Sequence, residues 1–305
     1  MTGERELVVA RLHQRLLAEA GASGWGYYSG KSSRVEPTCW ALLALTATAA
    51  AGISDRDGFE WRHLAYLSGT QRDSGLLVET DEPLSNLSSN GLALATLASL
   101  RAPDARVLRD RLLTAVVAVK GVSLPPSPGP QDNQLQGWPW VKDTFSWVEP
   151  TAWCLLALKK AASSQEAKAA AAPRVAEAER LLLNRMCSPG GWNYGNANTL
   201  GQDLRPYVPT TAVGLLAMQD HRGEAEIQRC SRWLTDDRLS EPSTISLALT
   251  AMALGVYDVT ADDVESRLID AVAQSEKSGH LLAIAMAAYA LSADTHNLEA
   301  LRVQG

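Results

Sequence analysis

Two kinds of hydrophobic pattern alternate along this chain of 305 residues. Some stretches are rich in Ala and apolar on nearly every side, which is typical of a helix buried all round. Between them lie stretches whose apolar residues recur every three or four positions beside charged ones, typical of a helix with one buried face. These amphipathic stretches fall at residues 4–19, 59–70, 104–119, 166–186, 223–235 and 261–276.

The apolar stretches are copies of one internal repeat. Residues 25–45 read WGYYSGKSSRVEPTCWALLAL and residues 138–158 read WPWVKDTFSWVEPTAWCLLAL, with Pro twelve positions after the first Trp in both. A third copy, GGWNYGN…YVPTTAVGLLAM, spans residues 190–218. Self-similarity at a fixed period is the signature of a repeat architecture, so these copies set the organisation of the chain.

The spacing of the repeat indicates six copies. Pro150 and Pro209 are 59 residues apart, and Pro37 and Pro150 are 113 apart, close to twice that distance. A degenerate copy without the Trp or the Pro fills the interval, at residues 74–100. Two shorter copies follow at residues 239–254 and 278–291.

This pattern predicts an all-α fold made of six helical hairpins. Pro suits the first helical position, so each Pro is expected to begin an apolar inner helix that an amphipathic outer helix covers. An open array would expose an apolar helix at its end, and the last copy is as apolar as the others. We therefore predict one (α/α)6 toroid domain over residues 1–305, with inner and outer helix rings. Residues 121–137, rich in Pro and Gly, are expected to form an insertion loop over one mouth of the ring.

The repeat resembles that of the terpenoid cyclase and protein prenyltransferase superfamily. The resemblance lies in Gly-Gly-Trp before the loop and in the motif Val-Glu-Pro-Thr-Ala-Trp-Cys-Leu-Leu-Ala-Leu of residues 148–158. The resemblance covers most of the chain, and the repeat is similar to that of squalene-hopene cyclases. It implies a toroid with a central apolar cavity, entered from the end where the inner helices begin, that binds an isoprenoid or another apolar small molecule.

The resemblance places Glu149 at the position of a catalytic acid. Class II cyclases carry Asp-Xaa-Asp-Asp-Thr-Ala at the start of an inner helix, where the central Asp protonates an alkene or epoxide. The corresponding residues here are 147–152, with Glu149 on the central position and Trp147 and Pro150 in place of the flanking Asp residues.

The resemblance also brings zinc prenyltransferases into consideration. In these enzymes Asp and Cys on one inner helix and His on the next bind the metal. His280 falls on the His position, but residues 241–244 read Glu-Pro-Ser-Thr, without a Cys. One ligand does not make a zinc site. We therefore expect neither a zinc prenyltransferase nor any metal or cofactor.

Glu149 and Glu36 are the candidate catalytic residues, because each directly precedes the Pro of its repeat. The alternative is that both only favour the helix N-terminus, where a carboxylate is stabilised by the helix dipole. Candidate substrate-binding residues gather at the same end of the repeats. They are Trp40, Trp153, Trp138, Trp140, Trp147, Tyr194, Tyr207 and His280.

These side chains have alternatives too. Aromatic faces stabilise carbocations and stack on sugar rings, but Trp25, Trp138 and Trp192 are equally typical of structural ties between repeats. Trp40 and Trp153, one turn into their helices, are the best candidates for the cavity wall, although they could also face the outer ring. His280 could be a helix cap or a satisfied core group.

Charge and composition limit the classes of partner and the location that we expect for this protein. The formal net charge is −6 and no run of Lys or Arg occurs, which excludes a basic face for nucleic acid. Charges interrupt the N-terminus too early for a signal peptide, and no apolar stretch reaches the roughly 18 residues of a membrane span, so we expect a cytoplasmic protein. Four scattered Cys are expected to be small buried hydrophobes.

Three functions remain open from the sequence, since fold does not determine function. The first is a terpenoid-cyclase-like enzyme that starts cyclisation or isomerisation with Glu149 as the acid. The second is a non-catalytic toroid that binds a partner protein or a lipid. The third is a carbohydrate-active α/α barrel with Glu36 and Glu149 as a carboxylate pair, whose separation would test it.

Overall fold

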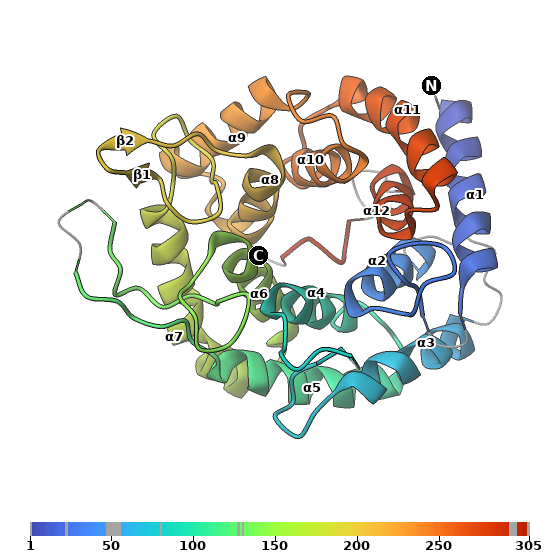
Figure 1. Ribbon diagram of the computed structural model, residues 1–305, viewed down its shortest axis with the longest axis horizontal. Helices are drawn as coiled ribbons and strands as arrows, with labels where there is room; N and C mark the ends of the chain where they lie inside the picture. The colour runs from blue at the N-terminus through green and yellow to red at the C-terminus, as the bar shows by residue number, and fades with distance from the viewer. Residues whose placement is uncertain are drawn as a thin grey trace.

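The chain forms a closed ring of helices in the computed structural model (Figure 1), which describes residues 2–21, 24–46, 56–79, 81–126, 129, 131–292 and 298–303. The inner ring contains α2 (Val35–Thr46), α4 (Leu87–Leu97), α6 (Val148–Ala161), α8 (Val208–Ala217), α10 (Thr244–Val256) and α12 (Leu281–Ser292). The outer ring contains α1 (Thr2–Glu19), α3 (Arg56–Thr70), α5 (Pro103–Ala118), α7 (Gln165–Asn184), α9 (Ala225–Asp237) and α11 (Asp262–Ser278). The predicted all-α toroid is confirmed.

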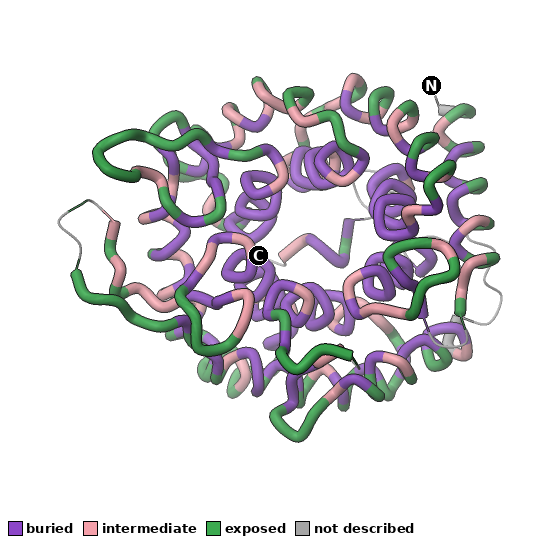
Figure 2. The backbone as a smooth tube through the Cα atoms, in the orientation of Figure 1, coloured by how far each residue is buried: buried purple, intermediate pink, exposed green. Residues whose placement is uncertain are grey.

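Burial follows the two hydrophobic patterns. Figure 2 shows inner helices that are buried along almost their whole length and outer helices with an exposed face. The helix starts differ in one detail from the prediction. Helices α2 and α6 begin two residues before their Pro, at Val35 and Val148. Pro37 and Pro150 therefore occupy the third helical position, which is tolerated because none of the first four N–H groups has an acceptor within the helix.

A Trp–Thr contact, repeated three times, joins an inner helix to the outer helix that precedes it. The N–H of Trp138 donates to Thr151 Oγ1 at 2.9 Å, and the Thr151 hydroxyl is 3.3 Å from the Trp138 carbonyl. The indole N–H of Trp138 donates to the carbonyl of Val116 on the preceding outer helix at 2.8 Å. The same contacts link Trp25 with Thr38 and Trp192 with Thr211. These Trp side chains are structural ties.

The degenerate second repeat makes the equivalent contact with an amide. Asn90 Oδ1 accepts from the N–H of Leu77 at 2.8 Å, and Asn90 Nδ2 donates to the carbonyl of Leu77 at 2.9 Å. The Asn90 amide thus takes the place of the Thr hydroxyl and the Leu77 backbone that of the Trp backbone, so the repeat stays in register.

The two ends of the chain close the ring. The N–H of Leu281, the first residue of α12, donates to the Tyr27 carbonyl at 2.8 Å, and the N–H of Ser29 donates to the Gly279 carbonyl at the same distance. Arg5 on α1 donates to the carbonyl of Leu291 at the end of α12. First and last repeats are therefore bonded to each other.

Neighbouring repeats are also linked through the first N–H of an inner helix. In α4 and α6 this N–H donates to a carbonyl in the next loop, of Trp140 and Tyr194 respectively. In α8 it donates to Glu241 Oε1 at 3.0 Å. Glu241 precedes its own helix, which begins only at Thr244, so its carboxylate stabilises the N-terminus of the neighbouring helix.

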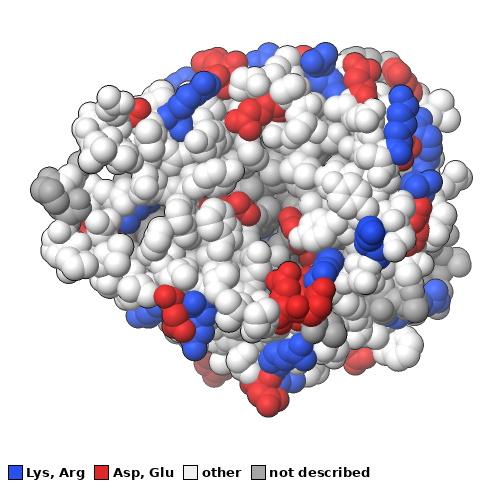
Figure 3. All heavy atoms as spheres, viewed as in Figure 1, with Lys and Arg blue, Asp and Glu red and all other residues white. Residues whose placement is uncertain are grey.

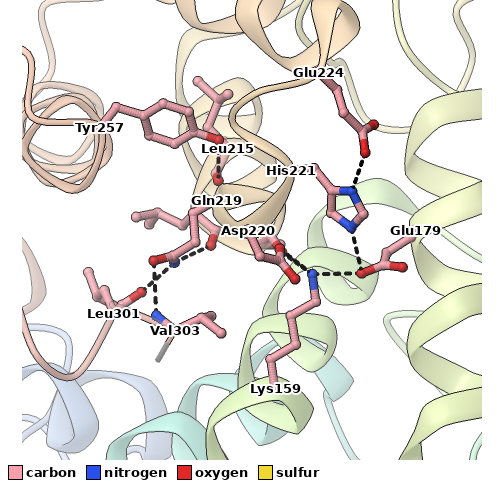
Figure 4. Close-up of polar contacts among 12 residues, drawn as sticks. Lys159, Glu179, Leu215, Gln219, Asp220, His221, Glu224, Tyr257, Leu301 and Val303 are labelled. Atoms are coloured by element: carbon pink, nitrogen blue, oxygen red, sulfur yellow. Dashed lines mark hydrogen bonds and ion pairs between the residues drawn. The ribbon is translucent and has the colours of Figure 1, made fainter. Parts of the chain in front are cut away.

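The end of the ring opposite the inner-helix N-termini is crossed by the C-terminal segment (Figure 1). Leu298 and Leu301 of this segment are buried. The side chain of Gln219, in the short 3₁₀ helix η2 (Gln219–His221), donates to the Leu301 carbonyl at 2.7 Å and accepts from the Val303 N–H at 2.9 Å (Figure 4). The central opening is thus covered from this side.

The described part of the segment 121–137 does not lie where it was expected. It runs outward along the edge of the ring near α7 and leaves the central opening uncovered (Figure 1). Residues 127, 128 and 130 lie outside the described residues. A two-stranded ribbon of β1 (Asn198–Thr199) and β2 (Gln202–Asp203), which no sequence pattern predicts, lies beside it. Among the described helices, none is long and apolar enough to cross a membrane.

Candidate functional site

A central cavity of about 160 Å³ opens at the inner-helix N-termini. Five inner helices line it with their second residue and their sixth, one turn deeper, and α8 adds Thr210. The second residues are Glu36, Glu149, Pro209, Ile245 and Leu282, and the sixth are Trp40, Trp153, Val213, Leu249 and Met286. Because positions four apart share one face of a helix, each helix presents one stripe to the cavity.

Ser88 is the second residue of the remaining inner helix, α4, and lies between the two acidic positions. The ring therefore has an acidic side, with Glu36, Ser88 and Glu149 on consecutive inner helices. Its other side is apolar, with Pro209, Ile245 and Leu282 at the equivalent positions.

Pro209 occupies the same position in its helix as Glu36 and Glu149 occupy in theirs. The repeat in the sequence aligns it with Pro150 instead. Helix α8 begins at Val208, so Pro209 is its second residue, as Glu149 is in α6. Thr211, and not Thr210, makes the contact with Trp192 that Thr151 makes with Trp138. The Pro residues of the third and fourth hairpins are therefore one position out of register.

Glu149 receives a hydrogen bond from the preceding inner helix. The Ser88 hydroxyl donates to Glu149 Oε1 at 2.8 Å. Burial raises the pKa of the Glu149 carboxyl, and the bond from Ser88 opposes part of that rise. The carboxyl thus keeps a proton more readily than one in water.

Glu36 is held in a similar way on the other side of Ser88. The Tyr27 hydroxyl donates to Glu36 Oε2 at 2.8 Å. Burial raises the pKa of Glu36, the bond from Tyr27 lowers it in part, and the charges of Glu149 and Glu79 raise it further.

Trp40 and Trp153 form the aromatic wall beneath these carboxyls. Their rings meet edge to face, with centroids 5.9 Å apart and planes at 76°. Trp40 also lies 6.0 Å from the buried ring of Tyr289. The structure places both Trp residues on the cavity side of their helices.

A row of aromatic side chains leads from the cavity across the rim. Ring centroids are 5.2 Å apart for Tyr207 and Tyr194, 5.9 Å for Tyr194 and Trp140, and 5.0 Å for Trp140 and Trp147. Phe145 continues the row at 4.5 Å from Trp147. Tyr194 is 48% exposed and lines the cavity, so the row begins at the site and reaches solvent.

Two of the candidate residues lie outside both the cavity and the aromatic row. Trp138 is fully buried, with the guanidinium of Arg174 4.1 Å above its ring, and its polar groups are used between helices, so it is not accessible to a substrate. His280 stacks on Tyr28 at 4.7 Å, where the ring closes. Burial lowers the pKa of His280.

Sequence reasoning missed Ser88 and Tyr27. Ser88 lies in the copy without Trp or Pro, where only the position after an apolar helix start marks it. Tyr27 lies nine residues before Glu36 in a loop, and no spacing rule brings a loop side chain to a helix start.

One group of residues has the composition of a metal site, at the other end of the ring. Ligand atoms of Glu179, Asp220 and His221 lie within 4.8 Å of one another. Lys159 Nζ is 2.8 Å from Glu179 and 2.6 Å from Asp220, so the protein's own ammonium group supplies the positive charge there (Figure 4). All four Cys are free and buried.

The charge distribution sets the mouth apart from the rim. Figure 3 shows a mostly uncharged face around the central hollow, with a few acidic groups at its edge and most other charges at the periphery. The exposed aromatic side chains contribute to that uncharged face.

Comparison with known proteins supports the fold. No protein-family model and no curated protein sequence matches the chain. A protein from Actinoplanes of solved structure is 14% identical with a TM-score of 0.59, and the match covers 94% of this chain and 98% of that one.

Rex8A from Paenibacillus barcinonensis is similar as well. Its complex with xylose has a TM-score of 0.57 at 14% identity, covering 99% of this chain and 95% of that one. A mutant of Rex8A complexed with an arabinofuranosyl-xylotetraose has a TM-score of 0.58 at 13% identity, with 99% and 94% covered. At these identities the likeness concerns the fold.

Proposed function

We propose that this protein acts on carbohydrate, as a glycoside hydrolase whose carboxylate pair is Glu36 and Glu149. The observation that carries the proposal is the placement of these two carboxyls, which line one cavity from equivalent helix positions on either side of Ser88. Glycoside hydrolysis uses a pair of acidic residues, one protonated and one ionised. The likeness to Rex8A, whose structures hold xylose or an arabinofuranosyl-xylotetraose, supports a sugar substrate.

In the proposed reaction the two carboxyls have different tasks. Burial raises the pKa of both, and the charges of Glu149 and Glu79 further favour the protonated form of Glu36. Glu36 donates that proton to the glycosidic oxygen as the bond to the anomeric carbon breaks. Glu149 accepts a proton from the water that attacks this carbon, and the Ser88 hydroxyl orients its carboxylate. The reaction consumes one water, and the proton that Glu36 gives up is matched by the one that Glu149 accepts.

The aromatic row offers a track for the rest of the sugar chain. Sugar rings present flat faces of C–H groups that pack on aromatic rings, and Tyr194 joins the row to the cavity. The cavity of about 160 Å³ holds only a short part of an oligosaccharide, so the remainder lies over the rim.

The test is turnover of a panel of neutral oligosaccharides, including xylo- and cello-oligosaccharides, with products identified by mass spectrometry. General acid–base catalysis is worth about 10²- to 10⁴-fold, so Glu36→Gln and Glu149→Gln should each lower kcat by that amount. Glu166→Gln, in the first turn of the outer helix α7 and exposed, is the matched control and should keep full activity.

Two results would contradict the proposal. One is folded wild-type protein that converts no member of the panel. The other is turnover that both Gln variants retain, because the carboxyls would then have no part in the reaction. Thermal unfolding of each variant shows whether a loss of activity is a loss of fold.

A second candidate function follows from the apolar side of the cavity. Pro209, Ile245 and Leu282, with Trp40 and Trp153 below, would suit an isoprenoid better than a sugar, and Glu149 would then be the acid that starts cyclisation. Incubation with squalene, its epoxide and linear prenyl diphosphates tests this, and cyclised product lost in Glu149→Gln would favour it over hydrolysis. Conversion of neither class would favour the non-catalytic toroid that binds a lipid or a partner protein.

A further inference from the structure

A second hollow, which we call the lateral pocket, lies at the edge of the ring where the segment 121–137 approaches the loop before β1. Its volume is about 280 Å³, larger than that of the central cavity. Figure 3 shows the surface hollowed between the two lobes at that edge. The residues that matter for recognition are Gln131, Asn133, Asn196, Arg185, Phe145 and Trp147.

Amide side chains of the lateral pocket are fixed relative to one another. Gln131 Nε2 donates to Asn133 Oδ1 at 3.0 Å and lies 3.2 Å from Asn196 Oδ1, which joins the segment 121–137 to the loop after Tyr194. Amides beside the rings of Phe145 and Trp147 combine hydrogen bonding with a stacking face, which is the chemistry that recognises a hydroxyl-rich ring.

Arg185 adds a positive charge that no acidic side chain neutralises directly. It is only 5% exposed and forms no direct ion pair within the described ranges, although the charge of the nearby Asp132 opposes the lowering of its pKa by burial. Its Nη2 donates to the backbone carbonyl of Asp132 at 2.9 Å, and Nη1 donates to the side chain of Asn184. Burial of an unpaired charge is costly, and an anionic ligand would offset that cost.

Ser146 is a second unsatisfied group in the same pocket. Its hydroxyl is buried and finds no hydrogen-bond partner among the residues that the structure describes. Buried hydroxyl groups nearly always have a partner, so the wall of the pocket holds an unsatisfied donor and acceptor beside Gly121.

The lateral pocket is continuous with the aromatic row. Trp147 lines the pocket, and its ring is linked through Trp140 to Tyr194, which lines the central cavity. Gly195, next to Tyr194, lines the pocket too, and a Cβ there would lie 3.4 Å from the Trp147 ring. One extended ligand can therefore occupy both sites.

We propose that the lateral pocket binds a carboxylate-bearing sugar, a uronic acid unit, of the oligosaccharide whose neutral part lies in the central cavity. The inference rests on the proposed function for the identity of that chain. Arg185 pairs with the carboxylate, the amides bind hydroxyl groups, and the sugar ring stacks on Phe145.

The experiment compares two probes, xylotriose and xylotriose substituted with glucuronic acid, by the quenching of Trp fluorescence at low salt. A hydrogen bond to a charged group contributes about 1.5–3 kcal/mol, so the acidic probe should bind wild-type protein roughly 10- to 100-fold more tightly. Arg185→Gln should abolish this preference. The exposed Arg180→Gln, in the last turns of the outer helix α7 that Arg185 follows, should leave it unchanged.

Two further variants separate the sites and guard against misfolding. Phe145→Ala, at a side chain that is 43% exposed, should weaken the acidic probe without affecting stability. Glu149→Gln, in the central cavity, should retain the preference. Equal affinity of the wild-type protein for both probes would refute the binding of a uronic acid in the lateral pocket. So would a preference for the acidic probe that survives in Arg185→Gln and falls in Glu149→Gln. Because the readout is binding, hydrolysis of neutral oligosaccharides without an acidic preference would refute this inference alone and leave the proposed function standing.

Discussion

Replacement of Thr151 by Val removes the Trp–Thr contact of the third inner helix, α6, without changing the size of the side chain. The Thr151 hydroxyl lies 2.9 Å from the Trp138 N–H and 3.3 Å from the Trp138 carbonyl, and the residue is fully buried. Gly137 makes this approach possible, since a Cβ there would lie 2.3 Å from the Thr151 hydroxyl oxygen. Water cannot replace the lost partner at such a site.

The expected cost follows from the two backbone groups. Each buried polar group left unsatisfied costs about 1–3 kcal/mol, and the added methyl group of Val offsets some of that. We expect Thr151→Val to lower the free energy of unfolding by about 2–4 kcal/mol. Thr151→Ser keeps the hydroxyl and loses one methyl group, so it should cost only about 1 kcal/mol.

Urea unfolding followed by circular dichroism measures both values, provided that the slope of the transition stays the same. Thr114→Val is the matched control, because its hydroxyl bonds the Asp110 carbonyl on the exposed face of an outer helix. A Thr151→Val protein within about 0.5 kcal/mol of wild type, the range of ordinary surface substitutions, would refute the view that this contact ties the inner helix to the outer helix that precedes it.

Three further predictions concern charge and packing. Burial and acidic neighbours raise the pKa of Glu36, so the folded protein still binds a proton at a pH where the unfolded chain has lost it. The stability of the wild-type protein should therefore fall as pH rises above about 4.5. Thermal unfolding measured across pH should show this loss relative to Glu36→Gln. Burial lowers the pKa of His221, but its bonds to Glu224 and Glu179 raise the pKa more. The contribution of His221 to stability is present below about pH 6.5 and is lost as pH rises through its pKa in the folded protein. His221→Gln should therefore lower the melting temperature in acid and change it little in base. Gly91→Ala should destabilise strongly, because the new Cβ would lie 2.7 Å from the backbone nitrogen of Cys154 on the adjacent helix; Gly69→Ala, with open space around it, is the control, and equal melting temperatures would contradict the close approach of α4 and α6.

The sequence predicted the architecture because the repeat carries it in local patterns. The expected outer helix at 166–186 corresponds to α7 at Gln165–Asn184, and the one at 261–276 corresponds to α11 at Asp262–Ser278. Apolar periodicity and Pro spacing are properties of neighbouring residues, so they are readable without the fold.

The register of the cavity was harder to predict. The alignment of Pro150 with Pro209 conceals that Pro209 occupies the position of Glu149, because the start of α8 depends on a bond from Val208 to Glu241 in the next repeat. Ser88 and the lateral pocket depend in the same way on contacts between distant segments. Such contacts have no signal in local spacing.

Closure of the ring also determines when the protein can fold. The bonds of Tyr27 and Ser29 with Leu281 and Gly279 join residues separated by about five-sixths of the chain. During synthesis, the faces of α1 and α2 that α12 covers stay without their partner until the last hairpin has left the ribosome. Since long-range contacts repay their loop-closure entropy only when they form, closure of the ring should slow folding relative to an open array of the same hairpins. A nascent chain of this architecture therefore exposes apolar surface for nearly the whole of its translation.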